Sequence, residues 1–386
     1  MKKIIYYVSY YSVPNDIEHR NSVLACTNKM NSIIDSLVEI GYFVNILSAS
    51  RANLNCICSR RTENLSSNIK IYYYCSFPWT NILNKILCRF SIFMGLFCQL
   101  LKLNKNDKVI VYHSLNYMPI IKLAHRIKKF HLILEIEEIY ADVINNIKIR
   151  EKELNFFSEG DSYIFPTKIL NNLINYNNKP AIIIHGTYKI ESEKTVISEK
   201  KQQHGTQNII HCVYAGTLDP RKGGAAAAAA AAKFLPENYC IHIIGFGSNE
   251  DIRVINNLIN DININSKCKV IYDGIKKGED YIQYLQNCDI GLSTQDPNAA
   301  FNSTSFPSKI LSYMANGLRV VSIRIPAIET SEIGDMMYYY DTQTPQDIAK
   351  AILSVNINDD YNSRNKIIKL YKNFTKKLEF FLNTIN

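Results

Sequence analysis

The stretch from 213 to 224, VYAGTLDPRKGG, places two cations and two glycines where a strand-like run gives way to a helix-like run. Arg221 and Lys222 stand directly before Gly223 and Gly224. Glycines let a ligand approach the backbone, and the first turn of a helix offers free N–H groups to an anion. This combination suits a diphosphate, although a basic turn before a helix is the alternative. The Gly-Lys-Ser/Thr order of a P-loop is absent.

A second stretch, FNSTSFPSKILSYMANGLRVVS from 301 to 322, has four small polar residues ahead of a predicted helix and a lysine in its first turn. The positive end of the helix dipole favours an anion at such a position. Helix capping by the same hydroxyl groups is the simpler alternative. The candidate anion contacts are Thr304, Ser305, Phe306, Lys309 and Ser312.

A third motif, IIGFGSNED from 243 to 251, follows a predicted strand. In IIGFGSNED, Gly245 and Gly247 end a strand, but no third glycine follows at dinucleotide-binding spacing. Ser248 and Asp251 have the spacing of a helix cap. These glycines therefore either approach a nucleotide or only keep side chains out of a cleft.

Carboxylates and one histidine mark strand ends in the first half. In LILEIEEIYADV, Glu135 and Glu137 share one strand face and Glu138 points the other way. His113 ends the strand of VYHSLNY. These side chains are candidates for a base or for electrostatic support of a reaction. A solvated acidic strand end and a structural histidine are the alternatives.

The elements that position these residues alternate between short apolar runs and longer helical patterns, which predicts parallel α/β sheets. We predict two Rossmann-like, doubly wound domains facing across a cleft. The polar, aperiodic run near 189 is the best linker. The predicted order is an N-terminal domain at 1–188, a linker at 189–208, a C-terminal domain at 209–362 and a helix at 363–386 that packs back on the first domain.

Composition narrows the classes of partner. The chain has 386 residues and a net charge of +9, which favours phosphate-bearing ligands or an anionic membrane face. No aromatic-basic motif supports nucleic-acid binding. The ten cysteines have no regular spacing, so we expect small, reduced core residues, a cytoplasmic location and no metal site.

The N-terminus is predicted to be a strand and not a signal peptide. The apolar segment Ile86–Leu103 predicts a buried core helix, with an interfacial membrane helix as the alternative.

The motifs together resemble a known enzyme family. In chain order they are "VYHS", "ILEIEEIY", "FPTKIL", "IIHG", "VYAGTLDPRKGG", "HIIGFG", "YLQNCDIGLS" and "SFPSKILSYMANGLRVVS". This series resembles a GT-B fold glycosyltransferase, closest to family 4 enzymes of bacterial capsule or O-antigen assembly. The resemblance covers nearly the whole chain and is strongest from Val213 to Ile323. It implies a nucleotide-sugar donor bound by the C-terminal domain and a saccharide acceptor bound by the N-terminal domain.

The resemblance also assigns roles to positions. Lys222 matches the family's diphosphate-binding lysine, and Arg221 substitutes for a family arginine that aligns with Thr217. The two family glutamates fall on Thr304 and Ser312, so both carboxylates are missing. Donor contacts are expected from Gly216, Thr217, Arg221, Lys222, Gly245, Gly247, Gly274, Thr304, Ser305, Phe306, Lys309 and Ser312.

In the N-terminal domain, the resemblance places Glu137 and Glu138 where the family has His-Asp, with Glu137 in the position that faces the donor sugar. The family's glycine-rich first loop is replaced by NDIEHRNSVL, in which His19 and Arg20 are expected to meet an anionic acceptor or donor phosphate.

The resulting prediction is a retaining, metal-independent glycosyltransferase of surface polysaccharide biosynthesis. It needs no cofactor beyond the nucleotide-sugar co-substrate. Its acceptor is expected to be lipid-linked, on the inner face of the cell membrane. One alternative is a GT-B scaffold or partner subunit that binds nucleotide-sugar without transfer, motivated by the missing glutamates. A sugar-nucleotide epimerase on the same fold is another.

Overall fold

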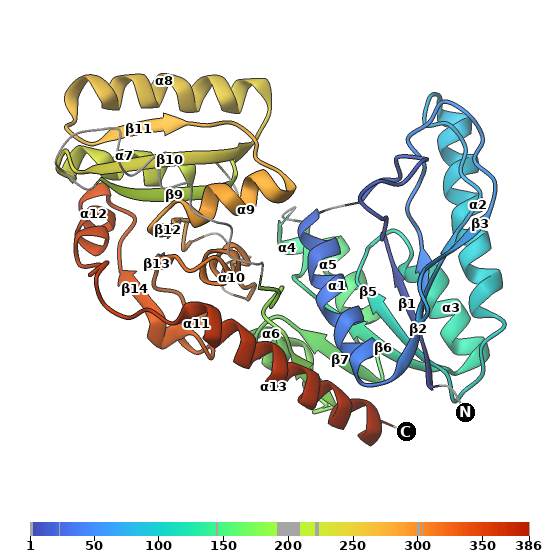
Figure 1. The fold of residues 1–386 in the computed structure, drawn as a ribbon. Helices are drawn as coiled ribbons and strands as arrows, with labels where there is room; N and C mark the ends of the chain where they lie inside the picture. Colours follow the sequence, from blue (N-terminus) through green and yellow to red (C-terminus); the bar gives the residue numbers. More distant parts are fainter. Residues whose placement is uncertain are drawn as a thin grey trace. The chain divides into compact units, whose positions relative to one another are not determined.

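The chain divides into two units, each built around its own sheet (Figure 1). Unit 1 comprises 1–187 with 372–386, and unit 2 comprises 188–371. The computed structural model describes residues 3–22, 24–143, 146–190, 209–220, 224–298, 302 and 304–385. Most of the predicted linker 189–208 lies outside these ranges.

Unit 1 has an eight-stranded sheet of order β3-β4-β2-β1-β5-β6-β7-β8, in which only β3 runs antiparallel to its neighbour. Its strands are β1 Lys3–Ser9, β2 Tyr42–Ser48, β3 Arg61–Ser66, β4 Ile69–Tyr73, β5 Lys108–Tyr112, β6 His131–Glu135, β7 Ser162–Phe165 and β8 Ala181–Ile183. Its helices are α1 Leu24–Glu39, α2 Ile82–Leu100, α3 Met118–Lys128, α4 Tyr140–Val143, α5 Ile147–Phe157 and α6 Lys168–Ile174.

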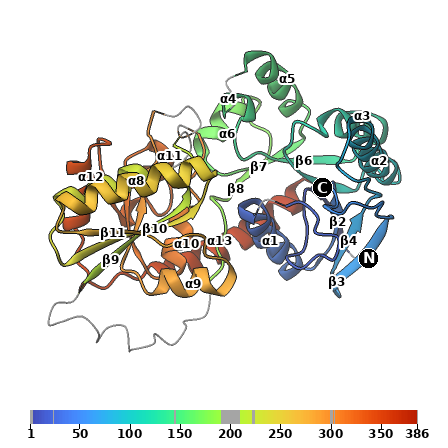
Figure 2. The same ribbon diagram turned by 90° about the horizontal axis from the view of Figure 1, so that it is seen from above.

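The central strands of unit 1 are buried on both faces, as expected of a parallel sheet covered by helices. Ile5 and Tyr7 of β1 are fully buried, and so is Val8, whose side chain points to the other face. Val8 belongs to a core shared with Cys88 and Leu96 of α2. Figure 2 shows α2 and α3 side by side in this unit.

Unit 2 has a six-stranded, wholly parallel sheet of order β11-β10-β9-β12-β13-β14. Its strands are β9 Ile210–Thr217, β10 Tyr239–Phe246, β11 Lys269–Tyr272, β12 Ile290–Ser293, β13 Arg319–Ile323 and β14 Met337–Tyr340. Its helices are α7 Ala225–Ala230, α8 Asn249–Asn265, α9 Gly278–Gln286, α10 Lys309–Ala315, α11 Pro326–Glu329 and α12 Pro345–Leu353, with short 3-10 turns at Ala231–Phe234 and Gly334–Met336. Figure 1 shows α8 on one side of the sheet and α9 with α10 on the other.

Both sheets have the strand order of doubly wound folds. The order reverses between β1 and β5 in unit 1 and between β9 and β12 in unit 2. In such sheets ligands bind beyond the carboxyl ends of the strands at this switch point. Helix α13, Ser363–Thr384, begins in unit 2 and ends in unit 1, where the Thr375 hydroxyl lies 3.1 Å from that of Ser36 in α1.

Candidate functional site

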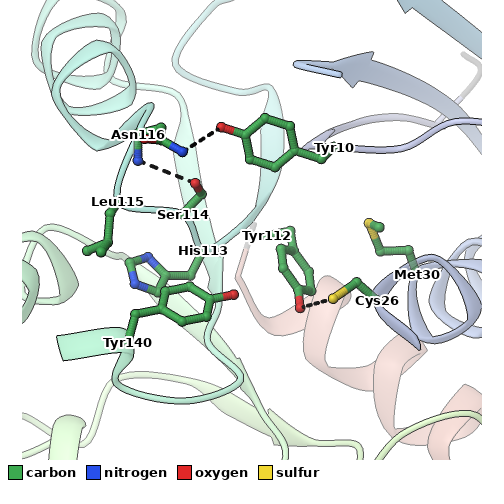
Figure 3. Close-up of a pocket in the computed structure, with 9 residues that line it drawn as sticks. All are labelled: Tyr10, Cys26, Met30, Tyr112, His113, Ser114, Leu115, Asn116 and Tyr140. Carbon is green, nitrogen blue, oxygen red and sulfur yellow. Dashed lines mark hydrogen bonds between the residues drawn. The ribbon is translucent and has the colours of Figure 1, made fainter. Parts of the chain in front are cut away.

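The switch point of unit 1 carries a cavity of about 250 Å³ (Figure 3). Tyr10 follows β1, Tyr112 ends β5, and Cys26 and Met30 come from the first turns of α1. Further lining residues are His113, Ser114, Leu115, Asn116 and Tyr140. The Asn116 amide donates to the Tyr10 hydroxyl at 3.2 Å, and Tyr112 donates to the Cys26 sulfur at 2.9 Å. The cavity thus combines aromatic rings with hydroxyl and amide groups, a lining that suits a sugar.

His113 is buried in the wall of this cavity, where the sequence placed it at the end of a strand. Its Nε2 lies 2.6 Å from the Glu153 carboxylate, and its ring stacks on Tyr140 with centroids 5.1 Å apart. Burial lowers the pKa of His113, which outweighs the opposing effect of Glu153. The ring is therefore neutral with Nε2–H donating. Its Nδ1 has no partner among the described residues.

The carboxylates at the end of β6 differ in environment. Glu137 is half-buried and forms an ion pair with Lys29 of α1, with 2.5 Å between Oε1 and Nζ. Glu135 is fully buried and accepts a hydrogen bond from Tyr7, while its Oε1 has no partner among the described residues. Burial, and next the charge of Glu137, raise the pKa of Glu135 to about 8. Glu138 is partly exposed at the same edge. The structure therefore gives the predicted carboxylate Glu137 a cation partner that the sequence did not reveal.

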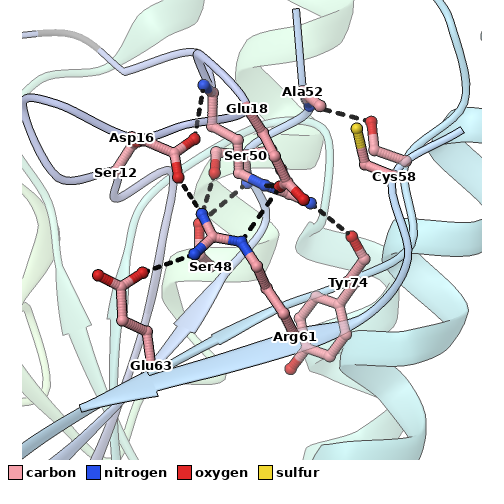
Figure 4. A network of polar contacts seen from close by, with 12 residues as sticks. Ser12, Asp16, Glu18, Ser48, Ser50, Ala52, Cys58, Arg61, Glu63 and Tyr74 are labelled. Atoms are coloured by element: carbon pink, nitrogen blue, oxygen red, sulfur yellow. Dashed lines mark hydrogen bonds and ion pairs between the residues drawn. The ribbon is translucent and has the colours of Figure 1, made fainter. Parts of the chain in front are cut away.

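Arg20, a predicted acceptor contact, points into the protein. Its guanidinium bonds the backbone carbonyl groups of Ser50 and Tyr74 at 2.7 and 3.0 Å and the Glu18 carboxylate at 2.5 Å. The surrounding network, in which Arg61 bonds Asp16 and Glu63, is drawn in Figure 4.

His19, the other half of the predicted pair, is exposed and has a left-handed backbone with φ of 48°. Anion binding by this pair stays a prediction. His19 could bind an anion with the structure as it stands, whereas Arg20 would first have to break its hydrogen bonds with Ser50, Tyr74 and Glu18.

A second cavity of about 230 Å³ adjoins the first, because Tyr10 and Asn116 line both. Its wall contains Trp79, the only tryptophan of the chain. Three cations surround this indole. Arg51, Arg89 and Lys85 lie 4.6, 5.3 and 5.8 Å from its ring centroid, close enough for cation–π attraction. None of the three forms an ion pair with a described carboxylate, so this wall of the cavity carries positive charge.

Helix α2 forms part of this second cavity and carries an exposed apolar face. Cys88, Ile92, Leu96 and Leu100 face the core of unit 1. The prediction of a buried core helix for Ile86–Leu103 therefore holds for only one stripe of α2. The exposed apolar face consists of Ile82, Leu83, Ile86, Leu87, Phe90 and Met94. Within the described parts of the chain, α2 is the one helix whose length and composition would permit it to cross a membrane.

At the switch point of unit 2, Lys309 reaches the end of β9. Its Nζ lies 3.9 Å from the ring centroid of Tyr214, and a Cβ on Gly216 would come within 3.1 Å of it. Gly216 thus leaves room for this cation, and the predicted donor residues Gly216 and Lys309 are brought together. The Thr217 hydroxyl accepts a hydrogen bond from the backbone N–H of Asp219 at 3.2 Å.

Gly224 begins helix α7 under tight packing. A Cβ there would lie 1.9 Å from the Thr294 backbone oxygen, so no other residue fits without movement. Its N–H donates to the Tyr214 hydroxyl at 3.0 Å, and its carbonyl accepts from the Thr294 hydroxyl at 2.8 Å. These contacts hold the start of α7 against the ends of β9 and β12. Arg221 and Lys222, which together with Gly223 precede Gly224 in the sequence, lie outside the described residues.

The structure explains why glycine, and no larger residue, occupies two of the other predicted positions. Gly245 has φ of 151°, and a Cβ there would overlap the Gly216 carbonyl oxygen at 1.7 Å. A Cβ on Gly247 would meet Leu218 and Asp251 at 3.0 and 2.8 Å. Both glycines therefore allow close packing at the edge of the sheet. Gly274, with φ of 70°, has open space around it.

The polar stretch before α10 is only partly exposed. Ser308 is the N-cap of α10 and makes no capping hydrogen bond with its side chain. Phe306 is buried. Ser312 lies 3.1 Å from the Tyr281 hydroxyl, which ties α10 to α9.

Several residues of these sites escaped the sequence reasoning because their partners are distant in the chain. Glu153 lies in a charged helix, and its one local signal is the spacing to Phe156 and Phe157, which face the core with it. Lys29 and Trp79 have no motif around them. Their contacts with the site residues become visible only in the folded structure.

Comparison with known proteins agrees with the fold. Residues 210–357 match the family described as Glycosyl transferases group 1. Sucrose-phosphate synthase from Thermosynechococcus elongatus is similar over 99% of this chain and 99% of its own, with a TM-score of 0.73 at 12% identity. Anabaena HepE in complex with UDP and glucose matches 99% of this chain and 100% of its own, with a TM-score of 0.66 at 13% identity.

A third solved structure, a trehalose-6-phosphate protein from E. coli bound with UDP-2-fluoro glucose, covers 99% of this chain and 98% of its own, with a TM-score of 0.66 at 12% identity. No curated protein sequence matches the chain. The predicted α/β fold of GT-B type is confirmed. The prediction of a transferase is also confirmed, by the match of residues 210–357 to the family described as Glycosyl transferases group 1.

Proposed function

We propose that the protein transfers a sugar from a nucleotide-sugar donor to a lipid-linked saccharide on the cytoplasmic face of a membrane, in surface polysaccharide assembly. The observation that carries the proposal is the position of Lys309. Its Nζ lies beside Gly216 at the carboxyl edge of the unit that matches glycosyltransferases over 210–357. A cation next to a side-chain-free strand end is an arrangement that suits the phosphates of a donor.

On the donor side, the proposed chemistry is electrostatic. A departing nucleoside diphosphate gains negative charge, which pre-placed cations stabilise. Lys309 is one such cation, and by the family resemblance Lys222 and Arg221 are the others. Two of the similar structures hold UDP with glucose or UDP-2-fluoro glucose, which supports a UDP-type donor here. Retention of anomeric configuration and independence from metal ions belong to the same proposal.

On the acceptor side, the two adjoining cavities of unit 1 have complementary linings. Arg51 and Arg89 beside Trp79 suit a phosphate that bears a saccharide. Tyr10 and Asn116, shared by both cavities, lead to His113. The neutral His113, whose Nδ1 has no described partner, is placed to accept a hydrogen bond from an acceptor hydroxyl.

The lipid portion of the acceptor accounts for the exposed apolar face of α2. A helix with one apolar face and flanking cations lies in the plane of a membrane interface, with its apolar side among the headgroups and acyl chains. In α2 the apolar face includes Ile86 and Phe90, which are 58% and 61% exposed, with Lys85 and Arg89 beside them. Docking in this orientation would bring a lipid-linked phosphate to the Trp79 cavity.

Radiolabelled transfer tests the proposal. The full chain is incubated with a panel of nucleotide-sugars and with lipid-linked saccharides in anionic vesicles. We expect a lipid-linked product with one donor and its loss in Lys222→Ala, while the matched control Lys233→Ala retains activity. Lys233 is exposed in the 3-10 turn Ala231–Phe234 that follows α7.

The other outcomes overturn the proposal in distinct ways. Binding of a nucleotide-sugar with no transfer to any acceptor would support the scaffold alternative, which the missing glutamates at Thr304 and Ser312 motivate. Conversion of the donor sugar without acceptor would support an epimerase. Wild-type turnover in Lys222→Ala would refute the assignment of the diphosphate site.

A further inference from the structure

Two histidines and a cysteine gather on one face of the unit 2 sheet, apart from the residues proposed for transfer. His211 lies near the start of β9 and pairs in register with Cys240 of β10. His242 follows two residues later on β10, so all three side chains share a face. One ligand atom from each lies within 4.8 Å of the others.

The hydrogen bonds around His242 determine which of its nitrogens is protonated. Its Nδ1 lies 3.0 Å from an oxygen of Asp273 and 2.8 Å from the Tyr284 hydroxyl. Tyr284 donates its own proton to the same Asp273 oxygen at 2.5 Å, so both neighbours are acceptors for Nδ1–H. The Nε2 of His242 therefore carries a lone pair, which accepts the hydrogen bond that Nδ1–H of His211 donates across 2.9 Å.

We propose that His211, Cys240 and His242 form a binding site for a Zn²⁺ ion. Zinc favours nitrogen and thiolate ligands in tetrahedral geometry, at about 2.0–2.1 Å from nitrogen and 2.3 Å from sulfur. Two imidazole nitrogens on one such ion lie about 3.4 Å apart, so the present separation of 2.9 Å has to open by only a fraction of an ångström. His211 moves its proton to Nε2, and the Cys240 thiol releases its proton to solvent.

The surroundings resemble the outer shell of known zinc sites. A zinc-bound histidine typically donates its other N–H to a carboxylate, which fixes the ring orientation. Asp273 makes this contact with His242 here. A second carboxylate, Asp289, accepts the backbone N–H of His211 at 2.8 Å and holds that residue in place. Both carboxylates add negative charge near the ion.

The three proposed ligands are accessible to a zinc ion from solvent, and they lie away from the proposed transfer site. Cys240 is buried, whereas His211 and His242 are partly exposed, so solvent can supply the ion and a water as fourth ligand. Lys269 pairs with Cys240 across β10 and β11, but its side chain is exposed and can extend into water. His242 precedes Gly245 by three residues, roughly 10 Å along the strand. The ion would thus link β9 to β10 below the edge that holds Gly216, outside the proposed transfer site.

Titration of the chelator-stripped full chain with Zn²⁺ against a chromophoric competitor tests the site. We expect one equivalent bound, with at least 100-fold weaker binding in Cys240→Ser and His242→Asn. Asp273→Asn leaves the three ligands intact and is expected to weaken binding 10- to 100-fold. Cys56→Ser, which removes an exposed cysteine of unit 1, serves as the control with unchanged affinity.

Co²⁺ provides a readout that a purely structural network would not give. We expect a thiolate-to-cobalt charge-transfer band in the wild type and its loss in Cys240→Ser. Thermal melts without metal establish that each variant is folded. Zn²⁺ should raise the Tm of the wild type and of the control Cys56→Ser, and should leave the Tm of Cys240→Ser and His242→Asn nearly unchanged. Absence of stoichiometric binding, or binding that Cys240→Ser leaves unchanged, would show that the cluster is only a hydrogen-bond network.

Discussion

The exposed apolar face of α2 leads to a quantitative prediction about membrane binding. The double variant Ile86→Ser/Phe90→Ser changes two side chains that are 58% and 61% exposed and therefore contribute little to the core. Full burial of an isoleucine or phenylalanine side chain is worth about 1.5–3 kcal/mol. Scaled by their exposure, the pair contributes about 2–4 kcal/mol if the membrane covers it fully. Because an interface covers it only in part, we expect vesicle binding to weaken roughly 10- to 100-fold.

Flotation with vesicles that contain anionic lipid measures this change. A matched control, Ile264→Ser/Phe380→Ser, alters an isoleucine and a phenylalanine that are 78% and 71% exposed on other helices. The wild type and this control should bind alike, and binding should weaken with salt because Lys85 and Arg89 each contribute about 1 kcal/mol near an anionic surface. Equal binding by the α2 variant and the wild type, or equal loss in the control, would refute the assignment of this face.

Three further predictions concern single residues. Lys309→Met should lower kcat/KM for the donor by about 10- to 100-fold in steady-state kinetics, since a hydrogen bond to a charged group is worth about 1.5–3 kcal/mol, while Lys309→Arg retains more activity. Glu135, with its pKa raised from 4.5 to about 8, holds a proton in the folded state that the unfolded state releases. Wild-type stability should therefore fall as the pH rises from about 4.5 to about 8. Thermal melts of Glu135→Gln across this pH range should lack that decline in stability. If the stability of this variant depends on pH as that of the wild type does, the prediction is contradicted. Gly224→Ala should destabilise unit 2 by several kcal/mol in urea unfolding, because its Cβ would overlap the Thr294 carbonyl; a midpoint within error of wild type would disprove the packing argument.

Much of the secondary structure followed from local patterns. The predicted N-terminal strand is present as β1, because its β-branched and aromatic run KIIYYVS favours a buried parallel strand. The elements that were missed are polar. Strand β3 reads RTENLS and lies at the sheet edge, and helix α5 reads IKIREKELNFF, with few apolar residues to signal its buried face.

The candidate site was less accessible to sequence reasoning. The pairing of Gly216 with Lys309 was foreseeable, because carboxyl ends of parallel strands share one edge of a sheet. The direction of Arg20 was not, since its partners Ser50 and Tyr74 come from other segments. The local sequence around an arginine does not show whether its side chain faces solvent or the backbone of a distant loop.

By itself, the sequence determined that this chain alternates strands and helices, divides into two α/β halves and carries cations after a strand of the second half. These properties depend on residues close together in the chain. Only the tertiary structure decided that Lys29 neutralises Glu137, that three cations surround Trp79, and that His211 meets Cys240 and His242. The reason is physical. Such contacts depend on strand register and helix packing, which bring together side chains separated by tens of residues, and no local pattern records which of them will meet.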